Sequence, residues 1–254
     1  MGDNGTMWRD IRQLYADCGA FALALPILFS VPAVLEFAQH VVEIKLGLFS
    51  QGLGAAAAFD QRRLSLGFAK SLAMLLPAYW FVRFMASRRD ADWARKIERP
   101  AATLYGVQFA LLAMAQWLSL FGPPPGLVLG LPPHLWDHAS LLLGALGVML
   151  GIYLAAWWVA WPLGNSAIGP LRSIAVMIGS FWRALIYMLA GFLPLAAVHQ
   201  LLNALPIGAP EWIVWLAVTI DSLVVGFLAL SSAGAVYLAA RHAARRRNIT
   251  LLAR

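Results

Sequence analysis

The sequence predicts an all-α fold, a polytopic bundle of six transmembrane helices with additional amphipathic helices at the membrane interface. Composition is the first reason: apolar residues make up 61% of the 254 residues and charged residues only 12%, whereas soluble domains carry about 45–50% and about 25%. The mean hydropathy of +0.72 is the second, and it also excludes a disordered chain. The third is that most charged residues stand between apolar runs of about 20 residues, the length of a spanning helix.

Six apolar runs approach or meet this length. They cover residues 18–35, 68–86, 101–121, 139–161, 184–205 and 212–240. The first run follows the amphipathic stretch 7–17 and contains Pro26 and Pro32, which are expected to kink it. The second run contains Lys70 and Arg83, whose long side chains can bring their charges to the headgroups.

The distribution of lysine and arginine predicts the orientation in the membrane. Connection 87–100 carries five basic residues and the C-terminal tail five arginines, whereas connections 122–138 and 203–211 carry none. The first connection, with three basic residues, is the one exception. We therefore expect both termini in the cytoplasm. Sixteen arginines against three lysines favour a bacterial origin, and hence the inner membrane.

The chain is predicted to form a single membrane domain, 1–254, built from two three-span halves, 1–125 and 126–254. Each half contains a span, a connection with an amphipathic stretch that ends near a glycine and a basic residue, and two further spans. An odd number of spans per half makes the arrangement an inverted repeat, a plan common in transporters.

Ionisable residues near the spans are the candidate functional residues, because charge inside a membrane is costly. Glu36, His40 and Glu43 share one face of a helix. Two carboxylates and an imidazole on one face could bind a divalent metal ion or relay protons. The favoured interpretation is structural, since the next helix carries a complementary stripe of residues, which are Asp60, Arg63, Gly67 and Lys70.

The two stripes are predicted to pack as a helical hairpin at the outer interface, around a glycine-rich turn at 50–54. Counting along the two antiparallel helices places Glu36 within reach of Lys70. The same count places Glu43 within reach of Arg63 or of the arginine before it. The Glu36–Lys70 pair is expected to be the more buried of the two, and so the more costly to break on one side.

His40 and Asp221 each have a structural and a functional interpretation. The same count places His40 against Leu64, an apolar neighbour that completes no metal site. Asp221 lies in the last run, roughly 15 Å after its start, and is expected to be structural, paired with Lys70 or with a neighbouring hydroxyl. The alternative is a proton-carrying acid of a transporter. Three histidines expected on the outer side keep a metal site there as an alternative; they are His134, His138 and His199.

A motif in the second half resembles one found in uncharacterised six-span bacterial inner-membrane proteins. It reads Ser173-x5-Gly179-x2-Trp182-Arg183. Those proteins are similar to the membrane domain of some glycerophosphoryl diester phosphodiesterases, and the resemblance covers residues 139–254. Ile174 and Met177 depart from the family pattern, which has Trp and Thr at these places. The resemblance implies a six-span topology, makes Arg183 a candidate functional residue, and implies no activity.

The sequence predicts a non-catalytic protein without cofactor or metal: a membrane scaffold, an assembly or envelope-maintenance factor, or an accessory subunit. No hydrolase or nucleotide-binding motif is present; Gly164-Asn-Ser166 lacks the second glycine of a nucleophile elbow. The alternatives are a small transporter or lipid-handling protein, and a metal-dependent membrane enzyme. Expected partners are the bilayer, with anionic lipid at the arginine-rich tail 241–247, and another membrane protein or a second copy. Nucleic acid is not expected.

Overall fold

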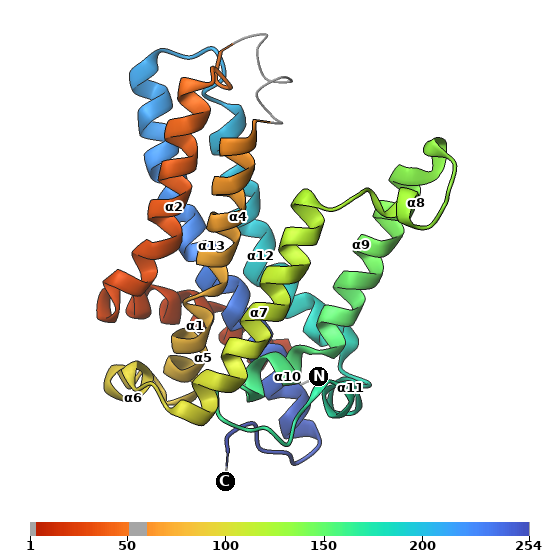
Figure 1. The fold of residues 1–254 in the computed structure, drawn as a ribbon. Coiled ribbons are helices and arrows are strands. Elements are labelled where there is room, and N and C mark those ends of the chain that lie inside the picture. Colours follow the sequence, from red (N-terminus) through yellow and green to blue (C-terminus); the bar gives the residue numbers. More distant parts are fainter. Residues whose placement is uncertain (1–3, 51–59, 254) are drawn as a thin grey trace. The chain divides into compact units, whose positions relative to one another are not determined.

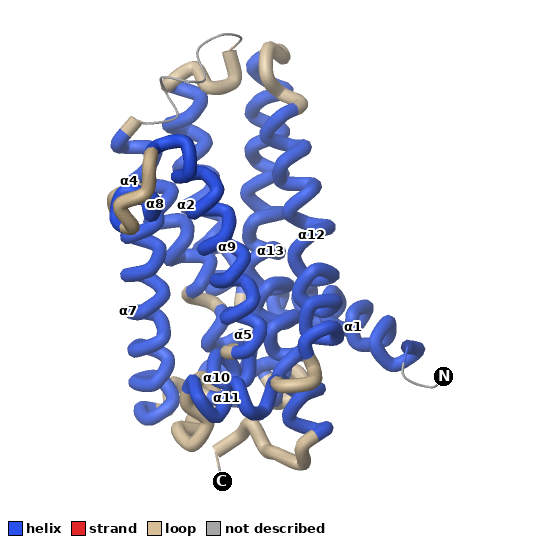
Figure 2. Tube along the Cα trace, turned by 90° about the vertical axis from the view of Figure 1, so that its right-hand side faces the viewer, coloured by secondary structure: helices blue, strands red, loops and turns tan. Residues whose placement is uncertain are grey.

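The computed structural model describes residues 4–50 and 60–253 as helices joined by loops, with no strand in these two ranges (Figures 1 and 2). Contacts divide the chain into two compact units. Unit 1 comprises Met1–Ile97 and Ile186–Leu238, and unit 2 comprises Glu98–Leu185 and Ala239–Arg254. These boundaries differ from those of the predicted halves, and the inverted repeat stays a prediction.

Among its described residues, unit 1 contains five complete helices and most of two others. They are α1 (Asn4–Ala24), α2 (Pro26–Lys45), α4 (Gln61–Leu75), α5 (Ala78–Ala86), α6 (Ala91–Arg95), α12 (Phe181–Ala204) and α13 (Glu211–Arg246). The helices that lie within unit 2 are α7 (Arg99–Phe121), α8 (Pro125–Val128), η1 (Pro133–Leu135), α9 (Trp136–Tyr153), α10 (Ala155–Ala160) and α11 (Pro170–Met177).

Six helical segments among the described residues are long and apolar enough to cross a membrane, which confirms the predicted fold class. These segments are Pro26–Lys45, Gln61–Ala86, Arg99–Phe121, Pro133–Tyr153, Phe181–Ala204 and Glu211–Arg246. The chain is therefore a multi-pass membrane protein. Four of the six lie within a few residues of the predicted runs or extend them by a turn or two, and the first and fourth differ.

The predicted first span, residues 18–35, is wrong. One helix, α1, ends at Ala24, and a second, α2, begins at Pro26 and runs to Lys45. Pro26 has no N–H to continue the first helix and restricts the residue before it, so it begins a new helix instead of kinking one. Pro32 does lie inside α2. Glu36, His40 and Glu43, which follow the predicted first span in the sequence, therefore lie inside the observed one.

The predicted fourth span ends too late, because the helix stops at Tyr153 and α10 follows as a separate helix. Ser173 of α11 explains the break. Its hydroxyl donates to the carbonyl of Tyr153 at 2.9 Å and accepts the backbone N–H of Trp157 at 2.9 Å. These two backbone groups would bond to each other in an unbroken helix, and the inserted side chain takes both.

The predicted packing of two helices around the polar stripes is confirmed, since α2 and α4 lie side by side (Figure 1). Asp60 begins α4 as its N-cap, with its carboxylate accepting the backbone N–H groups of Arg62 and Arg63. The turn predicted at 50–54 lies, after Ser50, outside the described residues.

Candidate metal centre

Four helices of unit 1 bring polar side chains into one buried cluster. The α2 helix contributes Glu36, Gln39, His40 and Glu43, which recur every three or four residues and therefore share one face. All four are buried. Because α2 is apolar enough to span a membrane, these groups need polar partners within the protein, on α2 itself or on neighbouring helices.

His40 lies between three carboxylates. Its Nδ1 is 2.8 Å from Oε2 of Glu43. Its Nε2 is 2.8 Å from Oδ2 of Asp221 on α13 and 3.2 Å from Oε1 of Glu36. Both ring nitrogens thus face anionic oxygen atoms, so the imidazole either carries a proton on each nitrogen or shares one side with another cation.

The carboxylate of Asp221 also contacts two polar side chains of α12. Nδ1 of His199 lies 2.8 Å from Oδ1 and 2.9 Å from Oδ2 of this carboxylate. Nδ2 of Asn203, one turn further along α12, donates to Oδ2 of Asp221 at 3.0 Å and to the carbonyl of His199 at 2.8 Å. Asp221 therefore joins the histidine of α12 to the histidine of α2.

Two cationic side chains of α4 pair with the carboxylates of α2. Lys70 Nζ is 2.9 Å from Oε2 of Glu36, and Arg63 Nε is 2.9 Å from Oε1 of Glu43. Oε1 of Glu43 also accepts from Nε2 of Gln39 at 2.9 Å. The Glu36–Lys70 pair is the more buried of the two, as predicted: the lysine side chain is 19% exposed and the arginine side chain 28%.

The cluster carries an excess of negative charge when its imidazoles are neutral. Three carboxylates, those of Glu36, Glu43 and Asp221, face two permanent cations, Lys70 and Arg63. Uncompensated charge is costly in a low-dielectric environment. An additional positive charge, carried by a proton on an imidazole or by a bound cation, would offset it.

Three of these residues have the geometry of metal ligands. Glu36, His199 and Asp221 each offer one donor atom, and the three atoms lie within 4.8 Å of one another. Donors around a tetrahedral ion with bonds of about 2.1 Å lie about 3.4 Å apart, so side-chain movements of roughly 1 Å would close the site. His40 Nε2, beside Glu36 and Asp221, is available as a fourth ligand.

The surroundings also resemble those of metal sites. A metal-bound histidine usually donates its second ring N–H to a carboxylate or carbonyl, which orients the ring. Glu43 occupies this place on Nδ1 of His40. Glu36, His40 and Asp221 are each 1% exposed, whereas the side chain of His199 is 19% exposed. The centre of the site is therefore buried, and His199 is its most exposed ligand.

Five of the predicted site residues, Glu36, His40, Glu43, Lys70 and Asp221, do meet in this cluster, but the roles expected for two of them are wrong. His40 was expected to face Leu64, but its ring nitrogens face three carboxylates. Asp221 pairs with histidines and an amide and not with Lys70 or a hydroxyl. The hydroxyls beside it, on Thr219 and Ser222, bond to carbonyls of their own helix instead.

Asn203 was missed by the sequence analysis, and His199 was assigned only to the outer side. A signal for both was present: His199-x3-Asn203 places two polar groups on one face of an otherwise apolar run. The other two histidines of the predicted outer group, His134 and His138, belong to unit 2.

Arg183, the sixth predicted site residue, also belongs to unit 2, where its Nη1 lies 3.3 Å from Nδ1 of His242. Nearby, the tail arginines hold the turn between α11 and α12. Arg246 donates to the carbonyls of Ile178 and Gly179, and Arg247 donates to that of Ile178 at 3.1 Å. Gly179 adopts a φ of 78°, a conformation that favours glycine.

Comparison of the chain with protein families, with curated proteins and with solved structures finds no match.

Proposed function

We propose that the cluster binds a divalent transition-metal ion, and that the protein is a metal-handling membrane protein of the transporter class. Glu36, His199 and Asp221 would be ligands, with His40 as the fourth. The observation that carries the proposal is the convergence of these donors, within 4.8 Å for the first three, on helices apolar enough to span a membrane. Ionisable groups inside spans commonly mark ion pathways.

The ligand chemistry favours a transition metal. Imidazole nitrogen suits zinc, iron, copper or nickel, whereas calcium and magnesium prefer oxygen ligands alone. The burial of the centre favours a small ion over an organic substrate, because Glu36 and Asp221 are only 1% exposed. An ion could enter past His199, the more exposed ligand. These features support transport or storage of an ion more than a reaction on a large substrate.

The second candidate is the non-catalytic scaffold, in which the hydrogen bonds and ion pairs of the cluster only hold the helices together. One observation favours it: each carboxylate of the cluster already has a protein partner, and the closest nitrogen–oxygen distances are 2.8 to 2.9 Å. A protonated His40 would then supply the missing positive charge. The resemblance of residues 139–254 to the membrane domain of a phosphodiesterase would fit such an accessory role.

Metal analysis of the purified protein separates the two candidates. The full chain would be purified in mild detergent with a tag other than polyhistidine and dialysed against zinc, manganese or iron(II). Its metal content would then be measured by elemental mass spectrometry. We expect about one ion per chain, as for a single site with these ligands. Asp221→Asn and His199→Gln should lower this severalfold.

The control is Asp137→Asn, which removes an acid of unit 2 and should retain the ion. A wild-type protein that binds no metal under these conditions, and whose melting temperature is the same with and without a chelator, would contradict the metal proposal. The scaffold would then remain, with the same variants changing stability alone.

A further inference from the structure

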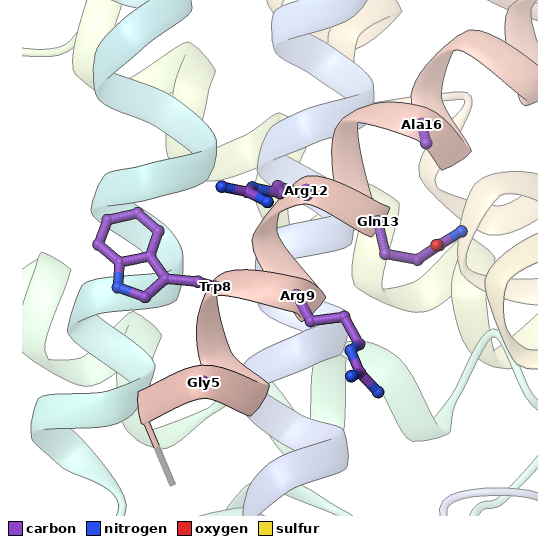
Figure 3. Close-up of a pocket in the computed structure, with 6 residues that line it drawn as sticks. All are labelled: Gly5, Trp8, Arg9, Arg12, Gln13 and Ala16. Atoms are coloured by element: carbon purple, nitrogen blue, oxygen red, sulfur yellow. The ribbon is translucent and has the colours of Figure 1, made fainter.

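The outward face of α1 carries positive charge and an aromatic ring. Its members are Gly5, Trp8, Arg9, Arg12, Gln13 and Ala16, all exposed, and they line a shallow hollow (Figure 3). The indole of Trp8 and the guanidinium of Arg12 extend to one flank of the helix, and Arg9 and Gln13 to the other. Trp8 is 61% exposed.

The opposite face of α1 packs against the rest of unit 1. Ile11, Leu14, Cys18 and Phe21 are buried there. This helix is not among the six segments apolar enough to span a membrane. A helix with one buried apolar face and one basic, aromatic face beside membrane spans has the pattern of an interfacial helix.

The acidic residues of α1 are engaged elsewhere. Asp10 accepts the hydroxyl of Tyr187 at 3.1 Å, and Asp17 pairs with Arg89 at 2.7 Å. Arg9 and Arg12, in contrast, form no hydrogen bond or ion pair with any residue in 4–50 or 60–253. The outward face of α1 is therefore a site of uncompensated positive charge with a tryptophan beside it.

We propose that this face of α1 binds the phosphate groups of anionic phospholipids, with Arg9 and Arg12 as the phosphate ligands and Trp8 at the level of the headgroups. Arginine pairs with phosphate through several N–H groups, and exposed tryptophan prefers the membrane interface. The tail arginines are a weaker candidate for this role, because Arg246 and Arg247 already donate to carbonyls of unit 2.

Native mass spectrometry of the full chain in detergent tests the proposal. The probes are phosphatidylglycerol and phosphatidylcholine with identical acyl chains. We expect the wild type to retain phosphatidylglycerol preferentially. The double variant Arg9→Gln/Arg12→Gln should reduce this preference roughly thirtyfold, since two arginines near an anionic surface together contribute about 2 kcal/mol. Arg9→Lys/Arg12→Lys should keep most of it, because the charge is conserved.

The matched control is Arg246→Gln/Arg247→Gln, which removes the same charge from the tail and should leave the preference unchanged. Equal melting temperatures for the α1 variants would show that they fold. A preference that survives the loss of both α1 arginines, or that disappears with the tail arginines instead, would overturn the proposal.

Discussion

Lys70 shows what a single buried charge requires of its neighbour. Its ammonium group lies 2.9 Å from Glu36, whose side chain is 1% exposed. Bringing two such charges out of water is costly, and their mutual attraction repays that cost only while both are present. Removing one partner therefore leaves the other as an uncompensated buried charge, which costs more than the pair was worth.

We expect Lys70→Met to destabilise the protein by about 3–5 kcal/mol, the cost of stranding Glu36. The free energy of unfolding in a mixed-detergent titration would measure it. The control is Arg62→Met on the same helix, because Arg62 is exposed and only its backbone N–H is bonded. Equal stability of the two variants would show that the Glu36–Lys70 pair does not matter to the fold.

The pairs between α2 and α4 could be predicted from the sequence because these helices are neighbours along the chain. Counting from a turn sets their register: it paired Glu36 with Lys70, as observed, and Glu43 with Arg62 or Arg63, of which the structure shows Arg63. No such count links His40 to Asp221, which is 181 residues away. Contacts between helices so far apart in sequence depend on the packing of the whole bundle.

At the scale of the element, Gly191 sets how closely α12 and α13 approach. A Cβ built on it would lie 2.7 Å from the carbonyl oxygen of Ser231 and 2.6 Å from Cβ of Ala235. The small residues Ser231 and Ala235 form the face of α13 that allows this close approach. Because these helices carry His199 and Asp221, their approach also positions the candidate metal centre.

Gly191→Ala should therefore destabilise the protein by about 1–3 kcal/mol, the usual cost of overpacking, and should weaken metal binding if the proposed site is correct. The readouts are the melting temperature and the metal content. Gly144→Ala in α9 is the matched control, since its added Cβ meets no described atom within 4 Å. If both variants melted alike, the close approach of α12 and α13 would not be required.

The α9 helix also carries closely spaced glycines, but no described residue packs against them. Added Cβ atoms at Gly144, Gly147 and Gly151 all meet open space. A small-residue pattern indicates that a helix can be approached closely but not that a neighbour does so. The boundary of the first span was mispredicted for a related reason. The prediction ended the span at the first charged residue, but α2 continues through Glu36, His40 and Glu43, whose charges have buried partners.

At the scale of the whole molecule, the orientation in the membrane stays a prediction, and Cys18 makes it simple to test. It is the only cysteine in the chain and is 1% exposed. Burial, together with the nearby Asp17 carboxylate, raises the pKa of the Cys18 thiol to about 12. The thiol form persists below this pH, so almost no reactive thiolate is present near neutrality and the native chain gives little background labelling.

We expect Leu129→Cys to react with a membrane-impermeant maleimide on intact cells and Asp92→Cys to react only after the cells are opened. The reason is that Leu129 lies in a connection without lysine or arginine, whereas Asp92 lies among five basic residues that favour the cytoplasmic side. Leu129 is 59% exposed, and it suits labelling better than nearby Gly126, where an added Cβ would clash with the ring of Trp136. The wild type, with Cys18 alone, measures the background. Labelling of Asp92→Cys on intact cells, with Leu129→Cys protected, would place the termini on the outside and reverse the orientation.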